Sequence, residues 1–267
     1  MSELTNELFE LSSEFLKVAN EMHQSCLRKE NKVYSDSRYI ISFYFRRAIE
    51  MFESFIVLTK EQRLTDSAVL LRSFWELGIN TGFIYHKRKN KELNSLRYLL
   101  DEHTVQKKII NANLQEFKET DDEIEQKRDE IIEDTFRVKR ELCKKYCEQD
   151  WKLPGIEERA KKSGLLVLYK AYNQVYRYLS NIEHHNIFFG KNYVDEKNCE
   201  PLKKLKENPL LAPDLNLIMF QSIFLEILKK FNEEFQLSWK DKLSELGKKH
   251  GEKYKKMQIL KSDRIQT

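Results

Sequence analysis

The sequence is poor in the residues that interrupt helices. Only 7 of its 267 residues are glycine and only 4 are proline. Folds built from many short strands depend on these residues at their turns, so their scarcity argues against such a fold. Charged residues make up 34% of the chain and aromatic residues 12%. This composition predicts an all-α protein, a multi-helix bundle long enough to bury a sizeable core.

Long apolar runs and clustered cysteines are missing as well. No segment approaches the roughly 20 apolar residues of a membrane span, and the first residues lack the basic and apolar regions of a signal peptide. The spacing of the four cysteines suits neither a disulfide framework nor a zinc site (Cys26, Cys143, Cys147 and Cys199). We therefore expect a cytoplasmic protein with reduced thiols, no membrane partner, no metal and no other cofactor.

Apolar residues that recur every three or four positions predict a series of long helices. Their expected ranges are 4–29, 36–58, 66–87, 91–117, 120–149 and a last core helix from 214. Thr65 and Asp214 are the expected N-caps of the third and the last helix. The third helix is apolar almost all round, which is typical of a helix at the centre of a bundle.

The charge pattern predicts how the chain is divided. Residues 1–236 are expected to form one bundle domain, from which 118–150 protrudes as a charged helical hairpin. This segment has only a thin apolar stripe, so it projects from the core or pairs with a protein partner. The stripe consists of Ile124, Ile131, Phe136, Val138 and Leu142. The Lys-rich residues 237–267 are expected to form a tail, either a marginal helix or a frayed end.

A compact polar cluster interrupts the apolar and aromatic segment 165–186. Arg177, Ser180 and His184 are three, four and seven residues apart, so on a helix they share one face. A guanidinium can bind two phosphate oxygens, and an imidazole can exchange protons near neutral pH. We expect Arg177, Ser180 and His184 to form a catalytic site, with Glu183 and His185 at its rim.

A second polar row lies on the third helix. Arg72, Glu76 and Asn80 follow one another at four-residue steps on an otherwise apolar helix. Buried charges need partners, so Arg72 and Glu76 must pair with each other or reach another helix. One interpretation makes this row the support of the site. The other makes it part of a hydrogen-bonded network with Ser180 and His184 that only fixes helix register.

Two segments carry a resemblance to known families. The Arg-x6-His spacing of Arg177 and His184 resembles the Arg-x(4–6)-His motif of bacterial HEPN domains, which are helical and usually dimeric. LLRSFWELGIN (70–80) and VYRYLSNIEHH (175–185) together resemble an uncharacterised bacterial helical family, over roughly 66–186, that pairs an Arg-x3-Glu helix with a Ser-x3-His helix. Tyr178 departs from the small polar residue that many HEPN domains have after the arginine.

The resemblance implies a fold and an activity. It implies a HEPN-like core, a homodimer and metal-independent cleavage of RNA, as in a toxin or a phage-defence effector. In such an enzyme Arg177 would hold the scissile phosphate and His184 would move a proton. Arg97 with His103 has the same spacing, and about one such pair is expected by chance in a chain of this composition.

Other functions remain open. A metal set of Glu183, His184 and His185 would need a further ligand, which Asp101, Glu102 or His103 could supply. No glycine-rich phosphate loop is present, and Cys199 has no base at a fixed spacing. The main alternative to an enzyme is a non-catalytic helical module that binds a protein or a nucleic acid through 118–150 and the Lys-rich end.

Overall fold

The computed structural model describes residues 2–28, 35–116, 122–147, 151–165, 175–176, 178–180 and 212–266. Within these ranges the regular structure is helical and contains no strand, which confirms the all-α multi-helix bundle. No described helix has the length and apolar character needed to cross a membrane. The elements are α1 (Glu3–Leu27), α2 (Asp36–Lys60), α3 (Leu64–Tyr85), η1 (Arg88–Asn90), α4 (Lys91–Glu116), α5 (Asp122–Lys145), α6 (Ile156–Lys162), α9 (Pro213–Phe235) and α10 (Lys240–Gln266).

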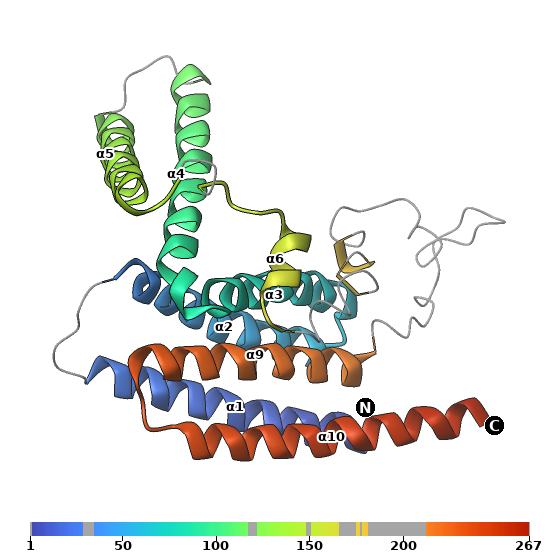
Figure 1. Cartoon of the computed structure of the whole chain (residues 1–267). Helices are drawn as coiled ribbons and strands as arrows, with labels where there is room; N and C mark the ends of the chain where they lie inside the picture. The colour runs from blue at the N-terminus through green and yellow to red at the C-terminus, as the bar shows by residue number, and fades with distance from the viewer. Residues whose placement is uncertain are drawn as a thin grey trace, which may run out of the picture.

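The helix α9 lies at the centre of the body. It packs against α1 and α10 on one side and against α2 and α3 on the other (Figure 1). Its buried residues are mostly apolar, and the ring of Phe220 stacks on Phe74 of α3 at 3.7 Å between centroids. The helix α3 contacts α2, α4, α6 and α9, so its apolar surface is covered on several sides, as its sequence predicts.

The helices α4 and α5 form a hairpin that rises from the body (Figure 1). They run antiparallel, since Lys145 at the end of α5 pairs with Glu92 at the start of α4 at 2.5 Å. Val138 and Leu142 are buried against Leu96. The protruding charged hairpin therefore exists, although its first helix is α4, which begins well before residue 118.

The position of Phe136 contradicts the expected apolar stripe of α5. Its side chain is 61% exposed, whereas Val138, two residues further on, is fully buried. Two residues correspond to about 200° on a helix, so Phe136 and Val138 cannot face the same neighbour. The buried stripe is narrower than the sequence pattern indicates, and Phe136 is left on the outer side of the hairpin.

Of the two forms expected for the C-terminal segment, the structure shows a helix: residues 240–266 form the long helix α10, which packs on α1 and α9. Leu243, Leu246 and Met257 are buried in the main core. Its lysines are neutralised by acids of α1, since Lys249 pairs with Glu14 at 2.7 Å and Lys253 with Glu7 at 3.0 Å. Sequence periodicity within α10 could not reveal these partners, because they lie more than two hundred residues away.

Docking of α10 should make stability sensitive to acid through His250. Its Nε2 lies 3.1 Å from the carbonyl oxygen of Ile218 and 3.1 Å from Oγ of Ser222 on α9. Burial lowers the pKa of His250 below its ordinary value of 6.5, because the imidazolium would lose its hydration. The unfolded chain therefore takes up the proton more readily, and the contribution of His250 is complete above about pH 6.5 and is lost as the pH falls.

We expect the free energy of unfolding of the wild type to fall more steeply between pH 7.5 and 5 than that of His250→Gln. Denaturant titrations at a series of pH values measure this difference. Lowering of the pKa of His103 by burial adds a similar dependence to both proteins and cancels in the comparison. Parallel pH profiles of the two proteins would contradict the prediction.

Both expected N-caps are wrong. α3 already begins at Leu64, so Thr65 lies inside its first turn, and the capping residue Arg63 makes no side-chain cap. α9 begins at Pro213, and Asp214 instead accepts hydrogen bonds from Ser2 and Thr5 in the first turn of α1. A carboxylate placed near two helix N-termini interacts favourably with both dipoles.

A short helix that the sequence pattern does not reveal connects the hairpin to the site. α6 follows Pro154 and Gly155 and spans only seven residues, too few for a periodic signal. The chain turns at Gly164, whose φ of +73° favours glycine, and a Cβ there would collide with the ring of His86. This turn fixes α6 against α3.

Candidate functional site

The polar row of α3 lies at the junction of α3, α4 and α6. The side chain of Arg72 is 18% exposed and that of Glu76 is 33% exposed, so the pair is only partly shielded from water. Their charged groups are 3.6 Å apart, which confirms that Arg72 and Glu76 pair with each other. Asn80 continues the row one turn further on and is half-buried.

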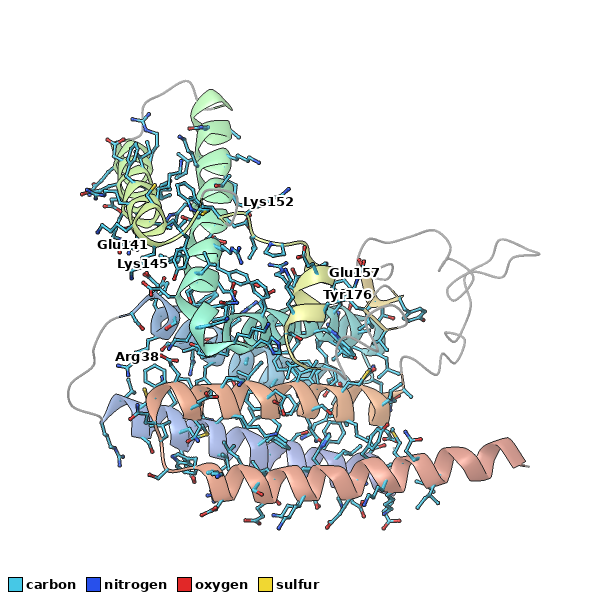
Figure 2. The ribbon with its side chains drawn as sticks, in the orientation of Figure 1. Arg38, Glu141, Lys145, Lys152, Glu157 and Tyr176 are labelled. Atoms are coloured by element: carbon cyan, nitrogen blue, oxygen red, sulfur yellow. The ribbon has the colours of Figure 1, made fainter. Side chains whose placement is uncertain are left out.

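Tyr176 joins this row to the segment that carries the second polar cluster. Its hydroxyl accepts a hydrogen bond from Arg72 at 2.9 Å and can donate to Glu76 at 3.5 Å. The guanidinium of Arg72 also lies 5.2 Å from the centre of the Tyr176 ring. Tyr176 is buried, and Figure 2 shows it beside α6. Two segments about a hundred residues apart in the chain therefore meet at Arg72 and Glu76.

A second arginine approaches the same carboxylate from α6. A guanidinium nitrogen of Arg159 lies 3.7 Å from Glu76, and another donates to the hydroxyl of Tyr98 at 3.2 Å. The guanidinium carbon is 5.4 Å from the centre of the Tyr98 ring, within the range of a cation–π contact. Glu76 is thus shared between the cations of Arg72 and Arg159.

Arg159 is incompletely satisfied among the described residues. Only 11% of its side chain is exposed, and its Nε is buried without a hydrogen-bond partner. Its ion pair with Glu76 is longer than a hydrogen bond. A buried guanidinium with an unused donor is costly, and such groups often mark the place of an ion or ligand. Arg159 is therefore the most informative side chain of the junction.

Aromatic hydroxyls complete the network. The hydroxyl of Tyr98 donates to Oδ1 of Asn80 at 2.6 Å, and the ring of Tyr44 meets that of Tyr98 edge-on. Burial raises the pKa of both tyrosines well above the ordinary value, because the phenolate would be desolvated. Both phenols stay protonated at physiological pH and act as hydrogen-bond donors and acceptors, not as bases.

The predicted site residues are only partly placed. Arg72, Glu76 and Asn80 lie in the network, and Ser180 is half-buried in the helical turn 178–180. Val175 and Tyr176 lie in a wider, π-helical turn, a local form that is frequent at functional sites. Arg177, Glu183, His184 and His185 lie outside the described residues, and so does Cys199.

The residues proposed as extra metal ligands point in different directions. Asp101 and Glu102 are exposed, whereas His103 is buried in the α4–α5 hairpin, where Asp134 and Arg137 are its charged neighbours. Among the residues that the structure describes, no group of three potential ligands could hold a metal ion. Arg97 and His103 are six residues apart, which puts them about 120° from each other around α4. The guanidinium of Arg97 donates to Asn94 at 3.1 Å.

Sequence reasoning missed Tyr98, Arg159 and Tyr176. Tyr176 adjoins the cluster that the sequence singles out, so its place beside Arg177 is a usable signal. Tyr98 and Arg159 offer no such signal, since Tyr98 lies in the expected helix 91–117 and Arg159 lies in none of the expected helices. Only the packing of α4 and α6 against α3 brings the two residues together.

Comparison with known proteins identifies the family without assigning an activity. No curated protein and no solved structure matches the chain. A family model does match, over residues 38–201, which is more than half of the chain. The matched range runs from α2 to beyond α6 and includes the whole network around Glu76. The chain thus belongs to a family of unknown function, DUF5677.

Proposed function

We propose that the chain is a HEPN-like, metal-independent endoribonuclease of the bacterial type. It acts in the cytoplasm as a homodimer and serves as a toxin or phage-defence effector. Arg177 and His184 carry the chemistry, Ser180 contacts the substrate or orients His184, and Glu183 and His185 lie at the rim. Arg72, Glu76 and Asn80 support the site from α3.

The hydrogen bond between Arg72 and Tyr176 is the observation that best supports the proposal. Tyr176 directly precedes Arg177 in the chain, and it is bound to Arg72 at 2.9 Å. The two polar sets singled out in the sequence therefore belong to neighbouring segments. A catalytic group must be held within a fraction of an ångström of its working position, and a buried tyrosine bonded to an ion pair supplies that kind of anchor.

Metal-independent cleavage of RNA requires one group that stabilises negative charge and one that transfers protons. In RNA the 2′-hydroxyl attacks the neighbouring phosphorus, the bond from phosphorus to the 5′-oxygen breaks, and a 2′,3′-cyclic phosphate and a 5′-hydroxyl result. A base takes the proton of the 2′-hydroxyl, and an acid returns a proton to the leaving 5′-oxygen. A histidine can serve in either role, and an arginine stabilises the charge that builds up on the phosphate oxygens.

Arg159 adds a second reason to expect a phosphate at the junction. Its buried Nε has no hydrogen-bond partner among the described residues, and its Nη2 lies 3.7 Å from Oε1 of Glu76. A phosphate oxygen next to Arg159 would supply the missing acceptor. Because Glu76 is one-third exposed, water and small anions can reach this side of the network.

Cleavage of an RNA oligonucleotide in EDTA tests the proposal. We expect the wild type to produce ends with a 2′,3′-cyclic phosphate and a 5′-hydroxyl. We expect His184→Ala to lose about a hundredfold or more in rate, the usual contribution of a general acid or base. Glu53→Ala, which changes an exposed residue of α2, is the control and should keep full activity. Equal activity or equal inactivity of the wild type and His184→Ala would refute the proposal.

A non-catalytic helical module is the second candidate, favoured by the pairing of Arg72 with Glu76 at 3.6 Å. In that case the network fixes helix register, and the chain binds a protein or a nucleic acid, through the charged segment 118–150 or the Lys-rich end. His184→Ala would then lower the melting temperature and leave no enzymatic activity to lose. An unchanged melting curve together with lost cleavage speaks for the enzyme.

A further inference from the structure

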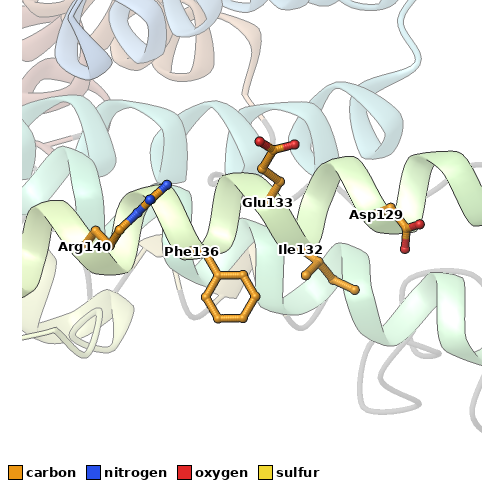
Figure 3. A pocket seen from close by; sticks show the side chains of 5 residues that line it. All are labelled: Asp129, Ile132, Glu133, Phe136 and Arg140. Carbon is orange, nitrogen blue, oxygen red and sulfur yellow. The ribbon is translucent and has the colours of Figure 1, made fainter.

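The outer face of α5 is an exposed surface with an ordered charge pattern, which we call the α5 face. It consists of Asp129, Ile132, Glu133, Phe136 and Arg140, which line one shallow hollow. Figure 3 shows Ile132 and Phe136 side by side, with Asp129 toward one end of the row and Arg140 at the other. This face is turned away from α4, because the residues buried against α4 lie on the opposite side of α5.

Within one chain, no other described helix covers the apolar part of the α5 face. Phe136 is 61% exposed on a helix that projects from the body. Neither Glu133 nor Arg140 makes an ion pair with another described residue. Charged neighbours on α5 pair among themselves instead, as Arg137 does with Asp134 and Lys144 with Glu141. Aromatic residues and arginine are enriched in protein–protein contact surfaces, and both occur on this face.

The order of the charges is self-complementary for an antiparallel partner. Acids lie on the N-terminal side of Phe136 and the base on its C-terminal side. A second α5 running in the opposite direction places its Arg140 opposite Asp129 and Glu133 of the first, and the reverse contact follows from the two-fold axis. Phe136 and Ile132 then meet the same residues of the second copy near that axis.

We propose that the α5 face is an antiparallel docking surface for a second copy of this chain. The position of α5 at the edge of the molecule leaves room for a second hairpin beside it (Figure 1). Two acids on the face disfavour a nucleic-acid backbone, which is negatively charged. One helix pair buries less area than a standard stable interface, so the association is weak and depends on concentration.

This inference rests on the homodimer of the proposed function. Its test measures the molecular mass of the protein in solution and does not depend on RNA cleavage. Sedimentation equilibrium from low to high micromolar concentration should show a monomer–dimer equilibrium for the wild type. Arg140→Glu makes all charges of the face acidic, and Asp129→Arg with Glu133→Arg makes them all basic. Each variant should raise the dimer dissociation constant about tenfold or more, since every charged contact occurs twice in the dimer.

Mixing the two variants provides the decisive measurement. The acidic and the basic face complement each other, so the mixture should dimerise although neither variant does so alone. Lys108→Glu, an exposed charge reversal on α4, is the matched control and should dimerise like the wild type. A monomeric wild type, or a dimer indifferent to both variants, would overturn the proposal and leave the RNA-cleavage test unaffected. Circular dichroism checks that the variants stay folded.

Discussion

Phe220→Ala is expected to lower the free energy of unfolding by about 3–5 kcal/mol, the usual cost of removing a buried phenylalanine. Phe220 is completely buried in α9, and its ring stacks on Phe74, Phe55 and Phe52 at 3.7, 4.2 and 5.1 Å. These rings come from α3 and α2, so one side chain ties three helices together. Rings stacked face to face cannot close the resulting gap without leaving their own positions.

Urea titration of the wild type and the variant measures the effect. Phe43→Ala on α2 is the matched control, since it removes the same side chain from a position that is 58% exposed. Its effect should stay within about 0.5 kcal/mol, as for most surface substitutions. A loss below about 1 kcal/mol for Phe220→Ala would mean that the core around α9 is not closely packed.

The sequence predicts best those helices whose type and ends are determined by their own residues. The periodic apolar rows of α1, α2, α4 and α9 fix both the type of element and, within a few residues, its ends. α10 and α6 show the limit of this reasoning. The lysines of α10 resemble a solvated tail until Glu7 and Glu14 of α1 are placed beside them. α6 depends on its packing against α3.

In the candidate site, too, some residues can be predicted from the sequence and others cannot. Arg72 and Glu76 can be found from the sequence, because two charges one turn apart on an apolar helix need an explanation. Arg159 cannot be found, since nothing near it indicates that it is buried, and its partners Glu76 and Tyr98 lie about eighty and sixty residues away. Contacts of this range are set by the packing of α6 and α4 on α3, which local pattern does not encode.

The network around Glu76 either only stabilises the fold or also binds an anion. The two interpretations predict different effects of Glu76→Gln on stability in the presence of phosphate. Glu76→Gln keeps the shape of the side chain but removes the charge that Arg72 and Arg159 share. We expect it to lower the free energy of unfolding by about 2 kcal/mol. This is less than the cost of breaking a fully buried pair, because Glu76 is one-third exposed. Glu53→Gln, on the exposed side of α2, is the control and should change stability little.

Measuring stability in the presence of inorganic phosphate distinguishes the two interpretations. If the junction is an anion site, removal of the competing carboxylate should strengthen phosphate binding, and phosphate should restore the stability lost in Glu76→Gln in proportion to its concentration. Adding Arg159→Met should abolish this rescue, since Arg159 supplies the buried donor. If the network is only structural, the double variant should recover stability by removing the unpaired charge, and phosphate should act on Glu76→Gln and Glu53→Gln alike. Full stability of Glu76→Gln without phosphate would contradict both readings, because the two arginines would then not depend on Glu76.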